Sequence, residues 1–246
     1  AVKAEYLKLN NTKYQSWKIN AIQPIYAWTD ITYLLHKNNV SWAFYYDNIS
    51  NDLSWLNLVS PLPWFQTVHE DGQLDNIQPL SRFFDAVKTG KLPSVVWIVP
   101  SFQNSEHPPA SIKKGQSYVT NIVNTIMQSP EWNNTVIFIS WDDWGGFYDH
   151  VTPPKVDENG YGLRVPGLVI SPYAKKGYIE HQNLSHDSYI KFIEDVFLDK
   201  RRIDAFDGRP DKRPTVRENI SELGDLRNDF DFTKNFIFRN KYYQQK

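Results

Sequence analysis

Two adjacent carboxylates follow an apolar run that we expect to form a strand. Asp142 and Asp143 come after TVIFIS and one tryptophan, and Gly145 and Gly146 follow them. Neighbouring carboxylates repel each other, and burying them unpaired is costly. A divalent cation removes this repulsion, and the hard ions Ca²⁺, Mg²⁺ and Mn²⁺ favour oxygen ligands. The pattern predicts a metal site, with an Asp pair that caps turns and helix ends as the alternative.

A second apolar run, SVVWIVP, is followed by a loop that carries Glu106 and His107 before two prolines. Histidine exchanges a proton near neutral pH, so His107 is suited to contact an anionic substrate or to protonate a leaving group. A loop histidine bonded to the backbone is the alternative. We also expect Glu106 and His150 to contact the substrate, with orienting a carboxylate or simple packing as the alternatives for His150.

The elements that must position these residues alternate between apolar runs and helical periodicity. Strands are expected at 40–46, 94–99, 135–140 and 165–170, and helices at 31–38, 79–88, 114–128 and 185–197. Such alternation indicates a largely parallel sheet covered on both faces, which is the α/β class. Functional groups in these sheets gather at the carboxyl ends of strands, where both loops begin.

The composition excludes several classes of function. The chain has no cysteine, which rules out disulfides, thiol catalysis, Fe–S clusters and Cys-ligated zinc. A net charge of −1 argues against a nucleic-acid binder or a polybasic membrane anchor. The apolar runs are far shorter than the ~20 residues that span a bilayer, so no transmembrane segment is expected.

We expect one domain over residues 1–246, with 199–246 as a charged, loop-rich tail that wraps the surface. Residues 47–68 are expected to form surface structure near the site. The chain starts at Ala1 with neither an initiator methionine nor a signal peptide, so we expect that its N-terminus was cut.

Aromatic residues make up 15% of the chain, a share that predicts an aromatic-rich core. The alternative is a carbohydrate- or glycolipid-binding module, because aromatic side chains also form sugar-binding surfaces. Its candidate residues are Trp55, Trp64 and Trp144.

Six segments resemble the phosphoesterase family, which includes bacterial phosphatidylcholine-type phospholipases C and acid phosphatases within the alkaline phosphatase superfamily. They are SWAFYY (41–46), NIQPLSRFFDA (76–86), NSEHPPASIKKGQSYV (104–119), WDDWGGFYDHVTPP (141–154), YGLRVPGLVISPYAKKGYI (161–179) and GDLRNDFDF (224–232). The resemblance extends from about Ile31 to Phe232, and matches this long and ordered are specific.

The resemblance implies an alkaline phosphatase-like α/β/α sandwich, with Asp142 and Asp143 as ligands of a divalent metal ion and His107 at the phosphate. Ca²⁺, Mg²⁺, Mn²⁺ and Zn²⁺ all stay open. The implied reaction is attack by a metal-activated Ser or Thr hydroxyl on a phosphoester, either a small molecule or a phospholipid head group, followed by hydrolysis of the phosphoenzyme. The resemblance also implies a secreted, cell-surface or periplasmic protein.

The chain departs from the family's pattern in its first residues. The family's Glu-Asn metal motif and its nucleophile lie upstream of the segment that begins at Ser41, and the residues before Ser41 contain neither. Glu218-Asn219 lies near the opposite end, in a charged loop, and is not counted as that motif. We therefore expect the C-terminal half of a catalytic domain, whose N-terminal half is supplied in cis or as a separate chain. A non-catalytic fragment or a degenerate homologue retained for binding is the alternative.

Overall fold

The computed structural model describes residues 24–47, 59–203 and 215–233. The chain divides into two compact units, unit 1 (1–129 and 203–212) and unit 2 (130–202 and 213–246). The interpretation of the whole chain as one domain stays a proposal. Within the predicted tail, residues 204–214 and 234–246 lie outside the described part of the chain.

Unit 1 is built on a parallel sheet of the three strands β2 (Ile77–Pro79), β1 (Trp42–Tyr46) and β3 (Val95–Val99), in that order. All five residues of β1 are buried, because the strand has a neighbour on each side and helices on both faces. Tyr46 pairs with Val99, so β1 and β3 end at the same edge of the sheet. The parallel sheet confirms the predicted α/β class.

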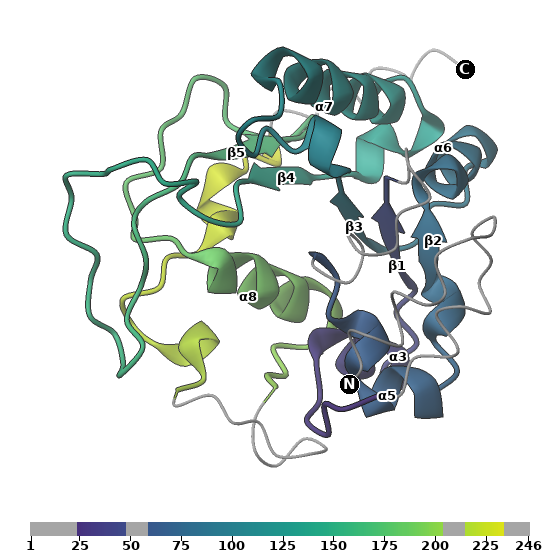
Figure 1. The fold of residues 1–246 in the computed structure, drawn as a ribbon, viewed down its shortest axis with the longest axis horizontal. Helices are drawn as coiled ribbons and strands as arrows, with labels where there is room; N and C mark the ends of the chain where they lie inside the picture. The colour runs from purple at the N-terminus through teal and green to yellow at the C-terminus, as the bar shows by residue number, and fades with distance from the viewer. Residues whose placement is uncertain (1–23, 48–58, 204–214, 234–246) are drawn as a thin grey trace. The chain divides into compact units, whose positions relative to one another are not determined.

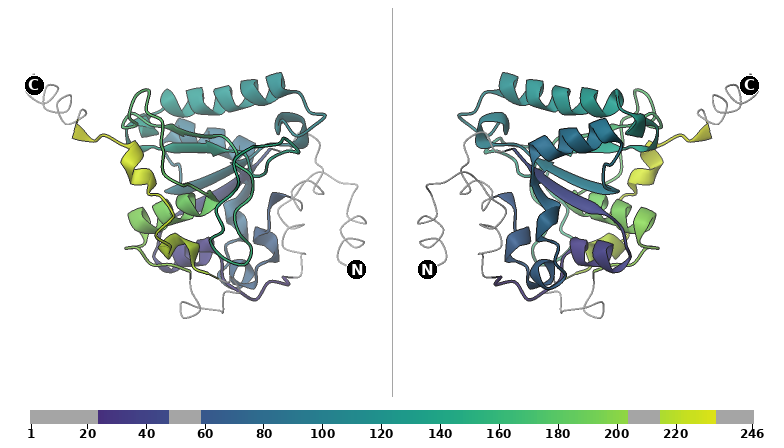
Figure 2. Two further views of the ribbon diagram at one scale, coloured as in Figure 1. Left: turned by 90° about the vertical axis from the view of Figure 1, so that its left-hand side faces the viewer. Right: turned by 90° about the vertical axis from the view of Figure 1, so that its right-hand side faces the viewer.

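Helices cover both faces of this sheet, so that unit 1 has three layers with the sheet in the middle (Figures 1 and 2). The helices are α3 (Ile31–Lys37), α5 (Gln66–Glu70), α6 (Leu80–Thr89) and α7 (Ile112–Met127). The pair α6 and α7 lies on one face, and α3 and α5 lie on the other. Gly90 ends α6 with a φ of 63°, as its position in the sequence predicts.

The segment that precedes α5 corrects one expectation. Residues 47–68 were expected to be surface structure, and 48–58 of these lie outside the described residues. Leu62, Phe65 and Val68 are nevertheless almost fully buried. Leu62 lies in the 3₁₀ helix 62–64, Val68 lies in α5, and Phe65 has an extended backbone between them. Phe65 packs against Tyr26 with ring centroids 5.2 Å apart.

Unit 2 contains an antiparallel pair, β4 (Ile137–Ser140) and β5 (Gly167–Ile170), and the helix α8 (His186–Phe197). No helix separates the two strands in sequence, so the chain can return antiparallel, with Ser140 opposite Gly167. The side chain of Ser185 caps α8 by accepting a hydrogen bond from Asp187 N, as its sequence position predicts.

Aromatic contacts join α8 to the strands of unit 2. Phe138 of β4 contacts Tyr189 and Phe192 of α8, with ring centroids 5.3 and 5.1 Å apart. The sequence also places Val196 on this apolar face, but its side chain is half exposed. Glu194 is fully buried instead, because Arg202 folds back and donates to its carboxylate at 3.1 Å.

Six 3₁₀ helices complete the regular structure of the described residues. They are η1 (Leu62–Trp64), η2 (Leu74–Asn76), η3 (Phe102–Asn104), η4 (Pro130–Asn134), η5 (Arg217–Asn219) and η6 (Leu226–Asp229). In the parts of the chain that the structure describes, no helix has both the length and the apolar character needed to cross a membrane.

Candidate active site at two strand ends

The loop after β3, residues 100–111, carries His107 and is called the His107 loop here. Asp47, the first residue beyond β1, holds the beginning of this loop. Its Oδ2 accepts hydrogen bonds from Ser101 N (3.3 Å), Ser101 Oγ (2.9 Å) and Asn104 Nδ2 (2.7 Å). Three donors on one carboxylate oxygen make a strong anchor, because hydrogen bonds to charged groups are stronger than neutral ones.

Sequence reasoning did not select Asp47, although a signal was present. Asp47 directly follows an apolar run, which is the same pattern that drew attention to the aspartates after TVIFIS.

The hydroxyl of Tyr118 on α7 is buried and has no hydrogen-bond partner among the described residues. Burial and the Asp47 charge raise the pKa of Tyr118, so this phenol stays neutral.

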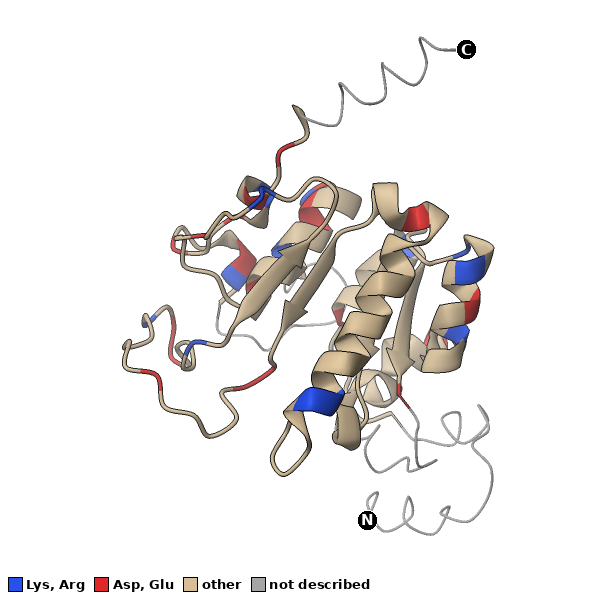
Figure 3. Ribbon diagram, turned by 90° about the horizontal axis from the view of Figure 1, so that it is seen from above, with Lys and Arg blue, Asp and Glu red and all other residues tan. Residues whose placement is uncertain are grey.

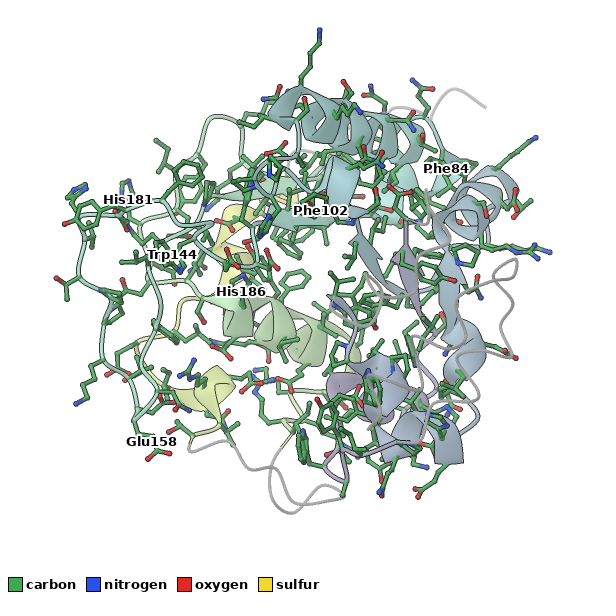
Figure 4. All side chains as sticks on the ribbon, in the orientation of Figure 1. Phe84, Phe102, Trp144, Glu158, His181 and His186 are labelled. Carbon is green, nitrogen blue, oxygen red and sulfur yellow. The ribbon has the colours of Figure 1, made fainter. Side chains whose placement is uncertain are left out.

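His107 lies exposed at the far end of its loop. Its Nδ1 is 2.8 Å from the carbonyl oxygen of Pro108, and its ring lies 5.6 Å from the ring of Phe102, which is labelled in Figure 4. A carbonyl only accepts, so Nδ1 carries the proton in this hydrogen bond. Nε2 has no partner in the described structure, and is therefore the atom that can exchange a proton with a ligand.

The side chain of Glu106 packs closely on the backbone of α7. Its backbone has a φ of 64°, a region that residues other than glycine rarely occupy. Its side chain packs over Gly115, where an added Cβ would lie 2.2 Å from the Glu106 Cγ. Glycine at position 115 is thus required by this packing. The Glu106 carboxylate has no hydrogen bond or ion pair among the described residues, which leaves its predicted substrate contact a proposal.

The second loop, residues 141–166, connects β4 to β5 and is called the aspartate loop here. Asp142 and Asp143 are both exposed in it. Asp142 Oδ1 accepts from Asp143 N at 3.1 Å, and Asp143 Oδ1 accepts from Gly145 N at 2.6 Å. Gly145 and Gly146 take φ values of 60° and 82°, which only glycine adopts readily. The two glycines therefore shape the turn that follows the aspartates.

The aspartate pair supplies part of a cation site. Each carboxylate uses one oxygen in a local hydrogen bond, and the Oδ2 atoms of Asp142 and Asp143 have no partner in the described parts of the chain. Within either unit, the described residues contain no group of three or more His, Asp and Glu placed to hold a metal ion. The donor chemistry suits a hard cation, which needs about six oxygen ligands, so the two aspartates form an incomplete set.

Asp149 and His150 lie further along the aspartate loop. Asp149 forms a two-bond ion pair with Arg164, Nε to Oδ2 at 2.7 Å and Nη2 to Oδ1 at 2.9 Å. These hydrogen bonds hold the pKa of Asp149 well below its usual range. His150 Nδ1 is 3.7 Å from Asp149 Oδ1, and its side chain is 81% exposed. His150 thus lies beside an already paired carboxylate, and its predicted contact with substrate stays a proposal.

Further charged contacts hold the returning part of the aspartate loop. Arg217 of η5 donates two hydrogen bonds to Asp157, both at 2.8 Å, and these bonds lower the pKa of Asp157 to about 2. Figure 3 shows charged residues of both signs along this loop, whereas α7 is charged only near its first turn.

A shallow hollow of about 280 Å³ lies at residues 153–161 of the aspartate loop and includes none of the predicted site residues.

The residues proposed for a sugar-binding surface do not gather in the described structure. Trp64 lies in η1 of unit 1, Trp144 lies half exposed in the aspartate loop of unit 2, where Figure 4 labels it, and Trp55 lies outside the described residues. The Glu218-Asn219 pair lies in η5, where Glu218 is buried and Asn219 accepts a hydrogen bond from Arg202.

The predicted site residues therefore form two groups. Glu106 and His107 adjoin each other in unit 1, and Asp142, Asp143 and His150 share one loop of unit 2. Each group follows a strand, as the sequence predicts. The described residues place an exposed imidazole in the first group and a pair of adjacent carboxylates in the second.

Comparison with known proteins identifies the family. The model of the family described as "Phosphoesterase family" matches residues 10–198. The match starts earlier than the Ile31 predicted from the six segments and stops before Phe232. Both strand-end loops lie inside it.

Three of the relatives that match are named phospholipases C. The non-hemolytic phospholipase C of Burkholderia pseudomallei is 28% identical over 265 residues, which cover 85% of this chain and 36% of that protein. The non-specific phospholipase C6 of Arabidopsis thaliana is 33% identical over 194 residues, covering 66% of this chain and 36% of the relative. Phospholipase C B of Mycobacterium tuberculosis is 27% identical over 210 residues, covering 72% and 40%. The chain thus spans 36–40% of the length of these relatives.

Proposed function

The chain belongs to the phosphoesterase family, and from this premise we propose that it forms part of an active site that hydrolyses phosphoric esters. The observation that carries the proposal is that the family match includes both His107 and the Asp142-Asp143 pair, each of which lies in a loop that follows a strand. The names of the relatives favour a phospholipid head group as the substrate, with a small phosphomonoester as the alternative.

We assign Asp142 and Asp143 as ligands of one divalent cation, Ca²⁺, Mg²⁺, Mn²⁺ or Zn²⁺. When bound, such an ion neutralises charge on a phosphoryl group and lowers the pKa of a coordinated hydroxyl. The two Oδ2 atoms are the free donors of the pair. The remaining ligands would come from outside the described residues, because the pair alone supplies too few oxygens.

His107 is assigned to the phosphoryl group and its leaving oxygen. Its Nδ1 is bonded to Pro108 O, so the ring presents Nε2 outward in a fixed orientation. In the protonated ring, Nε2–H donates to a phosphoryl oxygen and then transfers its proton to the alcohol oxygen as the P–O bond breaks. The neutral ring that results accepts a proton from water in the second step.

The attacking group is proposed to be a Ser or Thr hydroxyl that lies upstream of Ser41 in the complete catalytic domain. Its oxygen forms a bond to phosphorus, and water later breaks that bond. The relatives are long enough to contain such a segment, since this chain matches at most 40% of their length. The N-terminal half would be joined in cis or supplied as a separate chain, and the location would be secreted, cell-surface or periplasmic.

Hydrolysis of p-nitrophenyl phosphate and p-nitrophenyl phosphorylcholine tests this function. This chain alone and a form extended by the N-terminal half would each be assayed with Ca²⁺, Mg²⁺, Mn²⁺ and Zn²⁺. We expect turnover by the extended form, reduced about 10³-fold or more in Asp142→Asn/Asp143→Asn, because several kcal/mol of electrostatic stabilisation is lost.

The outcomes separate the alternatives. A folded extended form that turns over neither substrate with any of the four ions would favour the non-catalytic interpretation. Turnover by this chain alone would place the nucleophile within residues 1–246 and contradict the half-domain interpretation. Glycan binding that survives the double substitution would favour the carbohydrate-binding module instead.

A further inference from the structure

One carboxylate in the exposed aspartate loop is protected from solvent. The side chain of Asp149 is only 14% exposed, whereas Trp144, Phe147 and Tyr148 are 50%, 72% and 85% exposed. The difference arises from Arg164, which covers both carboxylate oxygens. Asp149 is therefore the point at which this part of the loop is fixed.

The contact is a two-bond pair with additional hydrogen bonds from the backbone. Besides its two guanidinium bonds, Asp149 Oδ2 accepts from Arg164 N at 3.3 Å, and Oδ1 accepts from Val151 N at 3.4 Å. Arg164 lies three residues before β5, so the pair connects the outgoing part of the loop to the root of the returning strand. A lysine could not reproduce this fork, because its ammonium group is a single point charge.

The other end of the same segment is also fixed. The carbonyl oxygen of Trp141 lies 3.0 Å from Nε2 of His186, the first residue of α8, which Figure 4 labels. A carbonyl accepts, so Nε2 donates. Residues 141–149, which contain both aspartates, are thus held at their start by α8 and at their end by Arg164.

We propose that Asp149 and Arg164 are a positioning pair that fixes the orientation in which Asp142 and Asp143 present their free oxygens to a divalent cation. The inference rests on the proposed function, since it assigns a role toward the same cation. Neither residue of the pair is itself a ligand: Arg164 is cationic, and both oxygens of Asp149 are occupied.

Amide hydrogen exchange on this 246-residue chain tests the pair without reference to catalysis. Arg164→Ala should accelerate exchange of the 142–148 amides about tenfold by promoting local opening, while the melting temperature changes little. Arg164→Lys should not restore protection. The charge swap Asp149→Arg/Arg164→Asp should restore most of it. Arg82→Ala, which removes an exposed arginine of unit 1, is the matched control and should change nothing in this loop.

Titration with Mn²⁺ by calorimetry, in the extended form, then tests the consequence for the cation. Loss of a group that hydrogen-bonds a metal ligand directly typically lowers metal affinity ~10–100-fold. Arg164 acts through the loop backbone, so we expect a decrease at the lower end of this range, about tenfold, for Arg164→Ala and recovery in the swap. Unchanged exchange of the 142–148 amides in Arg164→Ala and Arg164→Lys would overturn the pair. Faster exchange with unchanged Mn²⁺ affinity would overturn its role toward the cation. Absence of any Mn²⁺ binding by the extended wild-type protein would instead count against the proposed function.

Discussion

The two loops that carry the predicted site residues are fixed by different means. The His107 loop is anchored from the neighbouring parallel strand, because β1 and β3 end together and Asp47 reaches the donors of Ser101 and Asn104. The aspartate loop joins two antiparallel strands and is held by arginine side chains, Arg164 within the loop and Arg217 from η5. The parallel sheet thus provides a neighbouring strand end as an anchor, whereas the long antiparallel connection is held by charged side-chain pairs from within the loop and from η5.

The largest effect should come from His107, and it should depend on the leaving group. His107→Ala in the extended form is expected to lower kcat about 10²–10⁴-fold for an alkyl phosphate ester, since a proton donor contributes that much. p-Nitrophenolate leaves without a proton, so its ester should lose far less. Steady-state kinetics with both esters checks this. An equal loss for the two would place His107 at the phosphoryl oxygens and not at the leaving oxygen.

The anchor of the His107 loop should contribute strongly to stability. Asp47→Ala removes one acceptor from three donors and should lower the free energy of unfolding by about 2–3 kcal/mol, as charged hydrogen bonds typically contribute. Urea unfolding measures the change. Asp85→Ala, which removes an exposed carboxylate with one weak contact, is the control. A loss from Asp47→Ala no larger than that of the control would contradict the anchoring role.

The packing of Glu106 on α7 should appear as a clash when a methyl group is added. Gly115→Ala should destabilise the protein by about 1–2 kcal/mol, even though alanine favours a helix by ~1 kcal/mol over glycine. Glu106→Gly/Gly115→Ala should be at least as stable as wild type, because it removes the clash and the positive φ of a non-glycine residue. Urea unfolding of both variants decides, and a double variant as unstable as Gly115→Ala would contradict the contact.

The stability of unit 2 should depend on pH through two carboxyl groups whose pKa values are shifted in opposite directions. Burial and the nearby Glu180 carboxylate raise the pKa of Asp229 to about 6, while Lys175 opposes the shift. The native state therefore holds a proton that the unfolded chain has released, and stability should fall as pH rises from about 4 to 6. Asp229→Asn should remove this decrease in thermal unfolding measured across that range.

The control for this pH dependence is Asp225. Arg227 lowers the pKa of Asp225, so its contribution to stability is present above about pH 4 and is lost as the pH falls further. Asp225→Asn should therefore change the profile below pH 4 and leave the range from 4 to 6 as in wild type. A wild-type profile that is flat between pH 4 and 6 would contradict the assignment to Asp229.

The smallest effect should distinguish the two loops by ionic strength. At 1 M salt the Debye length falls to ~3 Å, so the Asp149–Arg164 pair, whose guanidinium side is 61% exposed, is screened more than the partly buried hydrogen bonds of Asp47. Exchange of the 142–151 amides should accelerate about two- to fivefold on going from 0.05 to 1 M NaCl, in keeping with the modest energy of exposed pairs. Amides at 101–105 should not change. Equal responses would remove the distinction between the two anchors.

The regular elements of the fold were largely predictable because local rules determine them. Gly90 ends α6 and Ser185 caps α8 at the positions that the sequence indicates. The three-residue strand β2 (Ile77–Pro79) was missed, because so short a run has no periodicity to detect. The α/β class followed from the apolar runs and was confirmed by the parallel sheet of unit 1.

The site was predictable as a list of residues and not as a set of contacts. Strand ends pointed to His107 and to the aspartate pair, yet the partners that hold them come from elsewhere in the chain. Asp47 is 54 residues from Ser101, and Arg217 is 60 residues from Asp157. Burial of Glu194 likewise depends on Arg202 folding back over it. Such pairings depend on tertiary structure and leave no local pattern in the sequence.

The register of the antiparallel strands has an evolutionary consequence. Ser140 lies opposite Gly167, so the entire 141–166 loop leaves β4 and rejoins β5 at one residue pair of the two-stranded sheet. Lengthening such an excursion changes little in the strands, since doubling a flexible loop costs only ~0.6 kcal/mol in closure entropy. Insertions and deletions between residues 151 and 156, before the Asp157–Arg217 pair, should therefore be tolerated while the aspartates and Arg164 keep their places.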